Sequence, residues 1–338
     1  MKKETLVSIA ERSGCSISTV SRVLSGNAAK YRISQRTVAR VTEEVKRCNY
    51  TPSLLAKGLR TNRTDTIGLL IPNIENSFFA GVAGVVIRES RNYNYKVVVV
   101  DTQEDERNEQ DGLSALLARR VDGIVAAPCG SNSELFASVQ EGGMPLVLID
   151  RYLPDAGMLS YVTTDNYRGA VMATEYLLEN GHRRIGFLGS ISSTSSIQDR
   201  YLGYYKALLE NRIPLRQDWV IADRSNESDI FPEFTLPNDM PTAFVCNCDE
   251  TAYKLVNQLK AAGYSIPDDI SVVGYDNHIY STICNPRLTT IDVNSRVMST
   301  EAVDIILHKI RDGNYRRGRT LVTGKLVRRG SVKNLNEA

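Results

Sequence analysis

The sequence of 338 residues lacks any long hydrophobic run. No apolar stretch approaches the roughly 18 residues needed to cross a bilayer. Glu11 and Arg12 interrupt the N-terminal segment, so it has no signal-peptide core. The six cysteines have no framework spacing, which favours reduced thiols over a disulfide scaffold. Together these absences predict a cytoplasmic protein with no membrane partner.

Motifs of common enzyme and metal-binding classes are also missing. The chain contains neither G-x-G-x-x-G nor G-x-x-x-x-G-K-[ST], so a cradle for nucleotide phosphates has no support. His182, His278 and His308 have no metal-ligand spacing, and C-N-C at 246–248 has too few sulfurs for a zinc site. S-L-L-A-K at 53–57 matches S-x-x-K without the companion motifs of that enzyme class. We therefore expect no enzyme, no metal and no cofactor.

Charge is distributed unevenly along the chain, although the net charge is only +2. Residues 1–63 carry 13 Lys and Arg against 4 Asp and Glu, a net charge of +9. The remaining chain carries 28 basic against 35 acidic side chains, a net charge of −7. A basic segment on an acidic body indicates that this segment alone binds a polyanion. Its ordered helical pattern argues against a merely solvated basic tail.

The N-terminal segment has the pattern of three short helices. Thr5 and Ser16 are suitable N-caps for the first two, and Gly14 supplies the tight turn between them. A third helix is expected at about 34–48. The three apolar stripes are Leu6, Ile9 and Ala10; Val20, Val23 and Leu24; and Val38, Val41 and Val45. Two short helices joined by a glycine turn, with a third closing the core, form a helix-turn-helix.

The second helix has the composition expected of a helix that enters the major groove. Short hydroxyl side chains let the backbone approach and contact phosphates or base edges. Arg22 can place its forked donors on a guanine, so we expect Ile17, Ser18 and Arg22 to read sequence. An ordinary amphipathic helix is the alternative, and the basic charge argues against it. The predicted DNA contacts in this segment are Thr5, Leu6, Ser16, Ile17, Ser18, Thr19, Ser21 and Arg22.

Two motifs together resemble the lactose-repressor (LacI/GalR) family of bacterial transcription regulators. They are L-V-S-I-A-E-R-S-G-C-S-I-S-T-V-S-R-V-L-S-G at 6–26 and N-Y-T-P-S-L-L-A-K-G-L-R-T at 49–61. The resemblance implies that residues 52–59 form a hinge helix that folds on operator DNA. It also implies that Leu59 wedges into the minor groove at the centre of a palindrome. A linker helix packed on the body is the alternative for this segment.

One segment departs from the family pattern. G-N-A-A-K-Y-R-I-S at 26–34 is longer than the corresponding loop of the lactose repressor. Lys30, Tyr31 and Arg32 in this loop either add phosphate contacts or are simply solvated. The departure leaves the predicted recognition helix unchanged.

Beyond residue 64 the sequence alternates β-rich apolar runs with helical segments. The expected strands are 67–71, 96–100, 123–127, 146–149, 184–189, 243–246 and 271–275. The expected helices include 79–92, 168–179, 200–210 and 251–261. This alternation indicates two doubly wound lobes of parallel sheet covered on both faces, with a ligand cleft between them.

The predicted fold is an all-α helix-turn-helix domain followed by a two-lobed α/β body. The family resemblance implies a body similar to periplasmic sugar-binding proteins, crossed by the chain near Thr163, Val293 and Thr323. The predicted parts are 1–51 (helix-turn-helix), 52–63 (hinge helix and linker) and 64–338 (effector binding and dimerisation). Lobe one is expected at 64–162 and 294–322, and lobe two at 163–293 and 323–338.

The family positions imply a set of effector contacts at strand ends. Phe78 would form an apolar wall, with Asp150, Arg200, Asp249 and Asp276 as polar contacts. Carboxylates with an arginine suit polyols, because they accept from and donate to neighbouring hydroxyls. A helix cap or a lobe-closing salt bridge is the alternative for each carboxylate. A cysteine at position 248, where the family often has asparagine, prevents copying of an effector identity.

Two classes of function fit the sequence. The first is a homodimeric transcription regulator that represses from palindromic, double-stranded operator DNA under control of a sugar, sugar phosphate or nucleoside. The second is a small-molecule binding module or α/β enzyme whose basic segment serves another purpose. The second lacks a nucleophile or acid–base constellation, and loss of specific DNA binding on deletion of residues 1–63 would separate the two.

Overall fold

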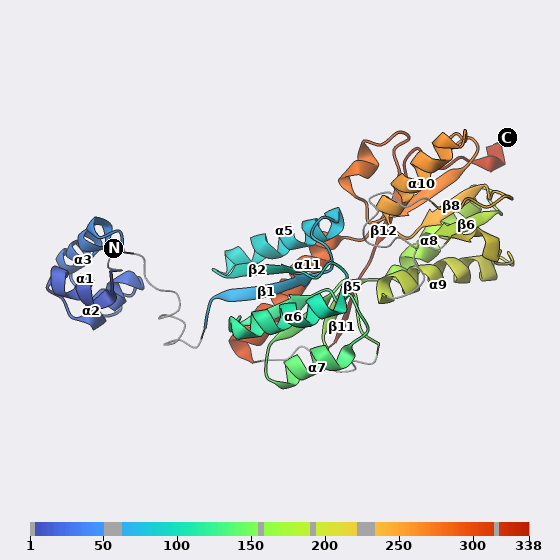
Figure 1. Cartoon of the computed structure of the whole chain (residues 1–338). Coiled ribbons are helices and arrows are strands. Elements are labelled where there is room, and N and C mark those ends of the chain that lie inside the picture. The colour runs from blue at the N-terminus through green and yellow to red at the C-terminus, as the bar shows by residue number, and fades with distance from the viewer. Residues whose placement is uncertain are drawn as a thin grey trace. The chain divides into compact units, whose positions relative to one another are not determined.

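The computed structural model divides into two units, residues 1–64 and 65–338 (Figure 1). It describes residues 4–50, 63–154, 159–189, 194–221, 234–313 and 318–337. The predicted hinge helix at 52–59, with its proposed wedge Leu59, lies outside the described residues. Each unit has a hydrophobic core of its own.

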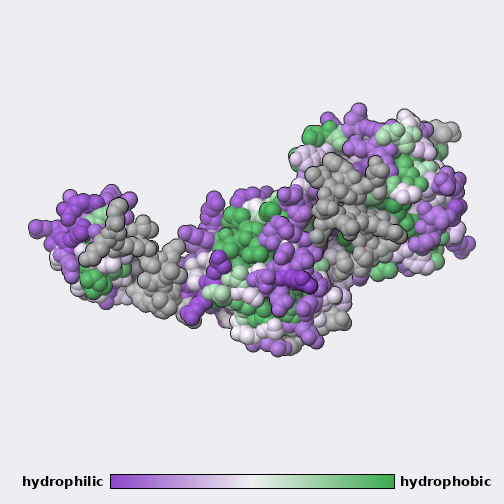
Figure 2. Space-filling model, viewed as in Figure 1, coloured by the Kyte–Doolittle hydropathy of each residue, from purple (hydrophilic) through white to green (hydrophobic). Residues whose placement is uncertain are grey.

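The N-terminal unit consists of three helices around one small core. The helices are α1 (Leu6–Ser13), α2 (Ile17–Leu24) and α3 (Gln35–Arg47). Ile9, Ala10, Val20 and Val41 are buried at the centre. Val38, which the helical pattern placed in the core, is only half-buried. One apolar stripe from each helix therefore meets the others, and hydrophilic residues cover much of the visible face of this unit (Figure 2).

Short polar side chains determine where these helices begin. Thr5, Ser16 and Ser34 are the N-caps of α1, α2 and α3, and each hydroxyl accepts a hydrogen bond from a backbone N–H of the first turn. Helix α1 stops at Gly14, whose φ of 60° lies in the left-handed region that glycine adopts most easily. The resulting short turn between α1 and α2 forms the predicted helix-turn-helix.

The first lobe of residues 65–338 is a six-stranded parallel sheet in the order β11-β5-β4-β3-β1-β2. Its strands are β1 (Thr66–Ile71), β2 (Lys96–Asp101), β3 (Gly123–Ala126), β4 (Leu146–Ile149), β5 (Tyr161–Thr164) and β11 (Arg319–Val322). One face is covered by α5 (Ser77–Asn92) and α11 (Ser295–Asp312), and the other by α6 (Glu106–Ala118) and α7 (Ser133–Glu141) (Figure 1). Burial on both faces explains the continuous apolar runs of the central strands.

The second lobe repeats this plan, with the strand order β12-β10-β9-β8-β6-β7. Its strands are β6 (Ile185–Leu188), β7 (Val220–Ile221), β8 (Ala243–Cys246), β9 (Ser271–Tyr275), β10 (Thr289–Asp292) and β12 (Lys325–Val327). Its covering helices are α8 (Asn166–Glu179) and α9 (Ser195–Glu210) on one face and α10 (Asp249–Ala261) on the other. One edge departs from the predicted parallel pairing, because β12 pairs antiparallel with β10.

The strands and helices predicted within the described residues are all present, but the apolar pattern missed several others. Strands β5 and β10 escaped because their sequences, Y-V-T-T and T-T-I-D, contain no apolar run. Strands β7, β11 and β12 have two to four residues, too few for a period to show. No helix in the described ranges combines the length and apolar content of a membrane span.

The described chain passes between the two sheets at three places: after β5, after β10 and between β11 and β12. The three passages are tied side by side. Thr164 Oγ1 donates to the Val293 carbonyl at 2.8 Å, and Asn294 Nδ2 donates to the Thr323 carbonyl at 2.6 Å. The two lobes are therefore joined by segments that are hydrogen-bonded to one another.

Candidate functional site

The exposed side of α2 presents hydroxyl groups at its N-terminal end. Ser16 Oγ accepts a hydrogen bond from the Thr19 N–H at 3.2 Å and lies 2.9 Å from Ser18 Oγ. Ile17 is 50% exposed, and the side chains of Ser18 and Arg22 are also exposed. Positions 17, 18, 21 and 22 follow helical spacing, so they share one side of α2. This side of α2 therefore carries an apolar side chain, two hydroxyl groups and a guanidinium.

The start of α1 offers a second polar surface. Thr5 is exposed and forms a capping box with Ser8, whose N–H donates to Thr5 Oγ1 at 3.2 Å while Ser8 Oγ accepts from the Thr5 N–H at 3.0 Å. Leu6 packs its side chain against the core. Its backbone N–H belongs to the helix start, where such groups have no intrahelical acceptor and suit a phosphate oxygen.

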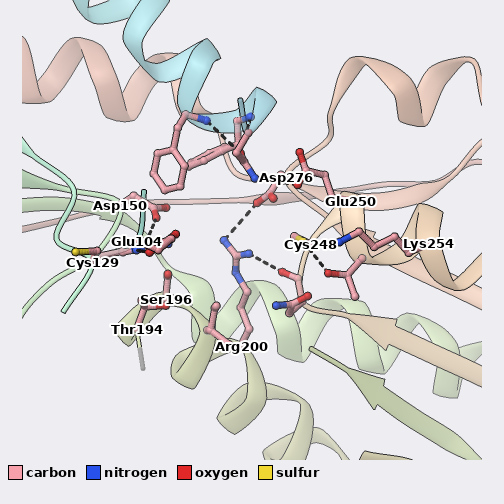
Figure 3. Close-up of a pocket in the computed structure, with 17 residues that line it drawn as sticks. Glu104, Cys129, Asp150, Thr194, Ser196, Arg200, Cys248, Glu250, Lys254 and Asp276 are labelled. Atoms are coloured by element: carbon pink, nitrogen blue, oxygen red, sulfur yellow. Dashed lines mark hydrogen bonds and ion pairs between the residues drawn. The ribbon is translucent and has the colours of Figure 1, made fainter. Parts of the chain in front are cut away.

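A cavity of about 440 Å³ lies between the two lobes, beyond the carboxyl ends of their strands (Figure 3). Its volume is typical of a small-molecule site. Phe78, Asp150, Arg200 and Asp276, all predicted effector contacts, are part of its lining, and Asp249 is not. The complete lining is Asn76, Phe78, Phe79, Glu104, Cys129, Asp150, Arg151, Thr194, Ser196, Ile197, Arg200, Asn247, Cys248, Glu250, Thr251, Lys254 and Asp276.

Three carboxylates reach the cavity from loops that follow strands. Asp150 comes directly after β4 and Asp276 directly after β9, with φ angles of 65° and 105°. Glu104 follows β2 closely and has a φ of 56°. A non-glycine residue in this region costs on the order of 1–3 kcal/mol and persists only where its surroundings fix it. All three of these left-handed backbone conformations lie at the lining of the cavity.

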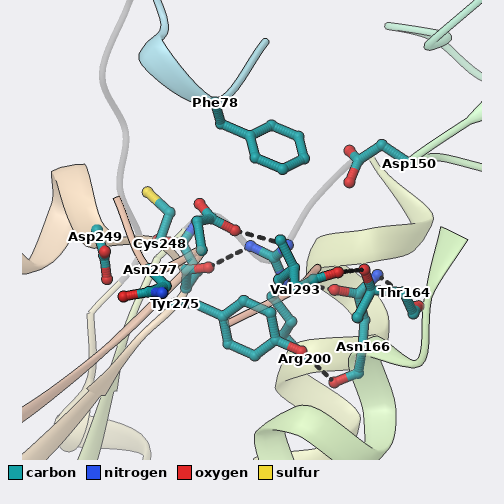
Figure 4. A network of polar contacts seen from close by, with 12 residues as sticks. Phe78, Asp150, Thr164, Asn166, Arg200, Cys248, Asp249, Tyr275, Asn277 and Val293 are labelled. Atoms are coloured by element: carbon teal, nitrogen blue, oxygen red, sulfur yellow. Dashed lines mark hydrogen bonds and ion pairs between the residues drawn. The ribbon is translucent and has the colours of Figure 1, made fainter. Parts of the chain in front are cut away.

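Arg200, from α9, is the centre of the polar contacts in the cavity (Figures 3 and 4). Its Nε donates to Asn166 Oδ1 at 2.9 Å, and its Nη1 donates to the Asn247 carbonyl at 2.6 Å. Its Nη2 lies 3.3 Å from Asp276 Oδ1, and its Cζ lies 3.9 Å from the centroid of the Tyr275 ring. The guanidinium is thus held by its edges and one face, so its orientation is fixed before any ligand arrives.

Burial controls the ionisation of the carboxylates around Arg200. It raises the pKa of Asp276 well above the ordinary value, and the charge of Arg200 opposes that rise. Burial also raises the pKa of Asp150, against the attraction of Arg200 and Arg151. Buried carboxylates perturbed in this way are typical of functional sites. Hydroxyl groups that donate to these oxygens would favour the charged form.

A second ion pair lines the cavity and was missed by the sequence analysis. Arg151 donates from Nη1 and Nη2 to the two oxygens of Glu104, both at 2.8 Å. Its Nη1 also donates to the Pro128 carbonyl at 3.1 Å, and its Cζ lies 5.3 Å from the Phe79 ring centroid. The available signal was the dipeptide Asp150-Arg151 directly after an apolar strand, where site residues are expected.

Hydrogen bonds join the lobes on both sides of the cavity. Asn76 Nδ2 and Ser77 Oγ in the first lobe donate to the Glu250 carboxylate in the second, at 3.0 and 3.4 Å. The Tyr152 N–H donates to Ser195 Oγ at 2.8 Å. The lobes therefore contact each other directly beside the cavity.

The side chain of Asp249 is held within the second lobe. It is the first residue of α10 and only 1% exposed, and its carboxylate accepts from the His278 N–H at 2.7 Å and from Thr290 Oγ1 at 2.6 Å. Burial raises the pKa of Asp249 to about 7. The carboxylate therefore anchors the loop after Asp276, and the effector contact predicted for Asp249 stays a prediction.

Phe78 and Cys248 give the cavity two uncharged surfaces. The rings of Phe78 and Phe79 meet edge to face, with centroids 5.1 Å apart, and Phe78 projects toward Arg200 from the first lobe (Figure 4). Burial raises the pKa of Cys248 to about 12, so it presents a neutral thiol. In the part of the chain that the structure describes, no group of His, Cys, Asp and Glu is placed to hold a metal ion.

Comparisons with known proteins assign both units. Residues 5–53 match the bacterial regulatory proteins of the lacI family, and residues 174–332 match the periplasmic binding protein-like domain. The HTH-type transcriptional repressor PurR of Photobacterium profundum is 32% identical over 336 residues, covering 98% of this chain and 99% of that protein. The chain belongs to the LacI family.

LacI-family membership decides between the two classes of function. The chain is a DNA-binding transcriptional repressor and not an enzyme, so the alternative of an α/β enzyme module is wrong. A second PurR repressor, from Aliivibrio salmonicida, is 30% identical over 335 residues, 98% of this chain and 99% of that protein.

Solved LacI-family structures share the fold. The Lac repressor bound to ONPG in its repressed state aligns with a TM-score of 0.84 at 24% identity, covering 98% of this chain and all of that one. A regulator from Enterococcus faecium with bound ribose aligns with a TM-score of 0.68 at 24% identity, covering 80% and 99%. The predicted helix-turn-helix domain with a two-lobed α/β body is confirmed.

Proposed function

We propose that this LacI-family repressor binds a palindromic operator as a homodimer and is controlled by a small sugar-like or nucleoside-like effector in the interlobe cavity. The observation that carries the proposal is a set of buried polar atoms at the cavity. Thr194 Oγ1 and Asn247 Oδ1 have no hydrogen-bond partner among the described residues. Asp276 Oδ1 faces Arg200 at 3.3 Å but makes no hydrogen bond to a described residue.

These atoms favour a ligand with several hydroxyl groups. A buried polar group without a partner costs about 1–3 kcal/mol, so a ligand that satisfies it gains affinity. The oxygens of Asn247 and Asp276 accept, whereas the Thr194 hydroxyl both donates and accepts. Hydroxyls also do both, and Phe78 supplies a surface for an apolar ring face. The Enterococcus faecium regulator holds ribose, which is a ligand of this class.

The proposed DNA-binding surface is the exposed side of α2 with the start of α1. Ile17, Ser18 and Arg22 contact bases, and the remaining predicted residues contact phosphates: Thr5, Leu6, Ser16, Thr19 and Ser21. The net charge of +9 in residues 1–63 supports this surface. The wedge role of Leu59 rests on its sequence motif.

An exposed apolar cluster supports the homodimer. Ile279 and Tyr280, in the short helix η2 (Ile279–Thr282), are 65% and 55% exposed, and Ile283 beside them is 72% exposed. Clusters of this kind mark protein interfaces. A two-fold partner would cover the cluster and would also match the two halves of a palindrome.

The test begins with an operator selected from random duplexes by the full-length protein. Sugars, sugar phosphates and nucleosides are then screened by thermal shift, because a ligand that binds only the folded state raises the Tm. Asp276→Asn should weaken binding of the identified effector about tenfold or more, through loss of a charge-assisted hydrogen bond, and leave effector-free operator affinity unchanged.

Asp268→Asn is the matched control, since the Asp268 side chain is 75% exposed in the same lobe. It should change neither affinity. Wild-type effector affinity of Asp276→Asn in calorimetry would refute the proposed contact. Failure to select any operator would refute the DNA-binding part independently.

A further inference from the structure

The lengthened loop between α2 and α3 is ordered by its own backbone hydrogen bonds. The Asn27 N–H donates to the Arg22 carbonyl at 3.0 Å, so the loop begins on the last turn of α2. The Tyr31 N–H donates to the Asn27 carbonyl at 3.2 Å, and the Ile33 N–H donates to the Ala28 carbonyl at 2.9 Å. These bonds form consecutive turns, so the position of each loop side chain relative to α2 is defined.

The loop brings one aromatic side chain onto the predicted recognition arginine. The Arg22 Cζ lies over the Tyr31 ring, 4.0 Å from its centroid. Tyr31 is 46% exposed, so part of its surface is covered and the rest faces solvent. Among the described residues none accepts a hydrogen bond from the Arg22 guanidinium, and the Tyr31 ring is what holds it.

Stacking on a face leaves the edges of a guanidinium free. The N–H groups of arginine point outward in the plane of the group, whereas an aromatic ring attracts its face. A guanine offers O6 and N7 to two parallel N–H groups in that plane. An arginine held by its face can therefore bind a base while it stays on the ring, with less rotamer freedom left to lose.

We infer that Tyr31 is a positioning residue that holds Arg22 in the orientation in which it reads a base. The inference rests on the proposed reading role of Arg22 and adds a specificity determinant outside the recognition helix. It gives the lengthened loop a function other than solvation or phosphate contact. The ring face of Tyr31 performs this role, and its hydroxyl does not.

The test compares Tyr31→Leu with Tyr31→Phe in the full-length protein on the selected operator. Arg22→Ala first identifies the base pair whose discrimination depends on the arginine. Tyr31→Leu should weaken binding to the operator about two- to fivefold, the effect of one exposed cation–π contact. It should leave binding unchanged on a duplex with that base pair replaced. Tyr31→Phe, which keeps the ring, should behave as wild type on both duplexes.

Lys30→Ala in the same loop is the matched control for a phosphate contact. Such a contact is lost equally on both duplexes, and its loss lowers the salt dependence of binding. In an Arg22→Ala background, Tyr31→Leu should have no further effect, because the two residues act as one unit. Circular dichroism checks that each variant retains its helices.

The inference would be overturned by additive losses in the double variant, by an equal loss in Tyr31→Phe, or by tighter operator binding by Tyr31→Leu. The last would mean that the ring holds Arg22 away from DNA. If Arg22→Ala leaves discrimination unchanged at every position, the proposed reading role fails and the role of Tyr31 fails with it. If Arg22→Ala loses discrimination as expected but Tyr31→Leu binds like the wild type, the role of Tyr31 fails and the reading role of Arg22 stands.

Discussion

Replacing Arg200 with methionine should destabilise the second lobe by about 3–5 kcal/mol, the usual effect of removing one partner from a buried ion pair. Methionine keeps an unbranched apolar stem but has neither charge nor donors. Asp276, whose side chain is 12% exposed, would lose the guanidinium 3.3 Å away. Asn166 Oδ1 and the Asn247 carbonyl would lose donors at 2.9 and 2.6 Å. The effect is large because the Asp276 carboxylate, the Asn166 amide oxygen and the Asn247 carbonyl oxygen all remain buried after Arg200 is removed.

A second substitution separates the charge from the other contacts. Asp276→Asn added to Arg200→Met removes the stranded carboxylate, so the double variant should be more stable than Arg200→Met by about 2 kcal/mol. The same carboxylate predicts a pH dependence. Without Arg200 the pKa of folded Asp276 lies still further above its unfolded value, so its contribution is present at low pH and is lost as pH rises. The loss of unfolding free energy in Arg200→Met, relative to the wild type, should therefore become smaller as the pH falls from about 8 to about 5.

Urea unfolding followed by tryptophan fluorescence measures these changes directly. Trp219 is the single tryptophan of the chain, 5% exposed and part of η1 (Gln217–Trp219) in the second lobe, so its emission reports unfolding where Arg200 lies. A loss below about 1 kcal/mol for Arg200→Met would refute the reasoning. So would a double variant no more stable than the single one.

Four further outcomes are expected. The pKa of Asp249 is raised to about 7, so the stability that it contributes is present below its unfolded pKa and lost as pH rises through the folded value. Asp249→Asn should therefore weaken the pH dependence of the urea midpoint between about pH 5 and about pH 8. An unchanged pH dependence would contradict this. Gly203→Ala should destabilise by about 1–3 kcal/mol, because its Cβ would lie 2.2 Å from the Tyr167 carbonyl oxygen. Gly81→Ala is the control, with no atom within 4 Å of the added Cβ, and it should stabilise by about 0.5–1 kcal/mol. Equal urea midpoints for Gly203→Ala and Gly81→Ala would argue against the close approach of α8 and α9. Leu59→Ala should reduce operator bending in a permuted-site gel-shift assay, and unchanged bending would exclude the wedge.

Local patterns were sufficient for most of the fold. Strands such as β1 and β4 are continuous apolar runs because they are buried on both faces. Helices such as α5 and α10 carry an apolar stripe because they are buried on one face only. Strands β5 and β10 have no such run. They were missed because neighbouring strands, and not their own composition, stabilise them.

The candidate cavity was only partly predictable. Asp150 and Asp276 end strands directly, and that position predicts a ligand site at the sheet edge. Glu104 and Arg151 are separated by 47 positions and meet only when β2 and β4 lie in one sheet. Asp249 follows Cys248, which lines the cavity, but its side chain points into the lobe and contacts the His278 N–H. A step of one residue at the start of a helix turns the side chain by about 100°.

The sequence by itself determined the two units, the helix-turn-helix, the alternating α/β order and the basic charge of the N-terminal unit. Each of these depends on neighbours within a few residues, so the information is local. Only the tertiary structure decided that Arg200 meets Asn166 and Asp276, and that Tyr31 stacks on Arg22. Those contacts join residues from different strands, helices and loops. Chain crossovers and packed cores bring Arg200 to its partners, and the turns of the loop bring Tyr31 over Arg22.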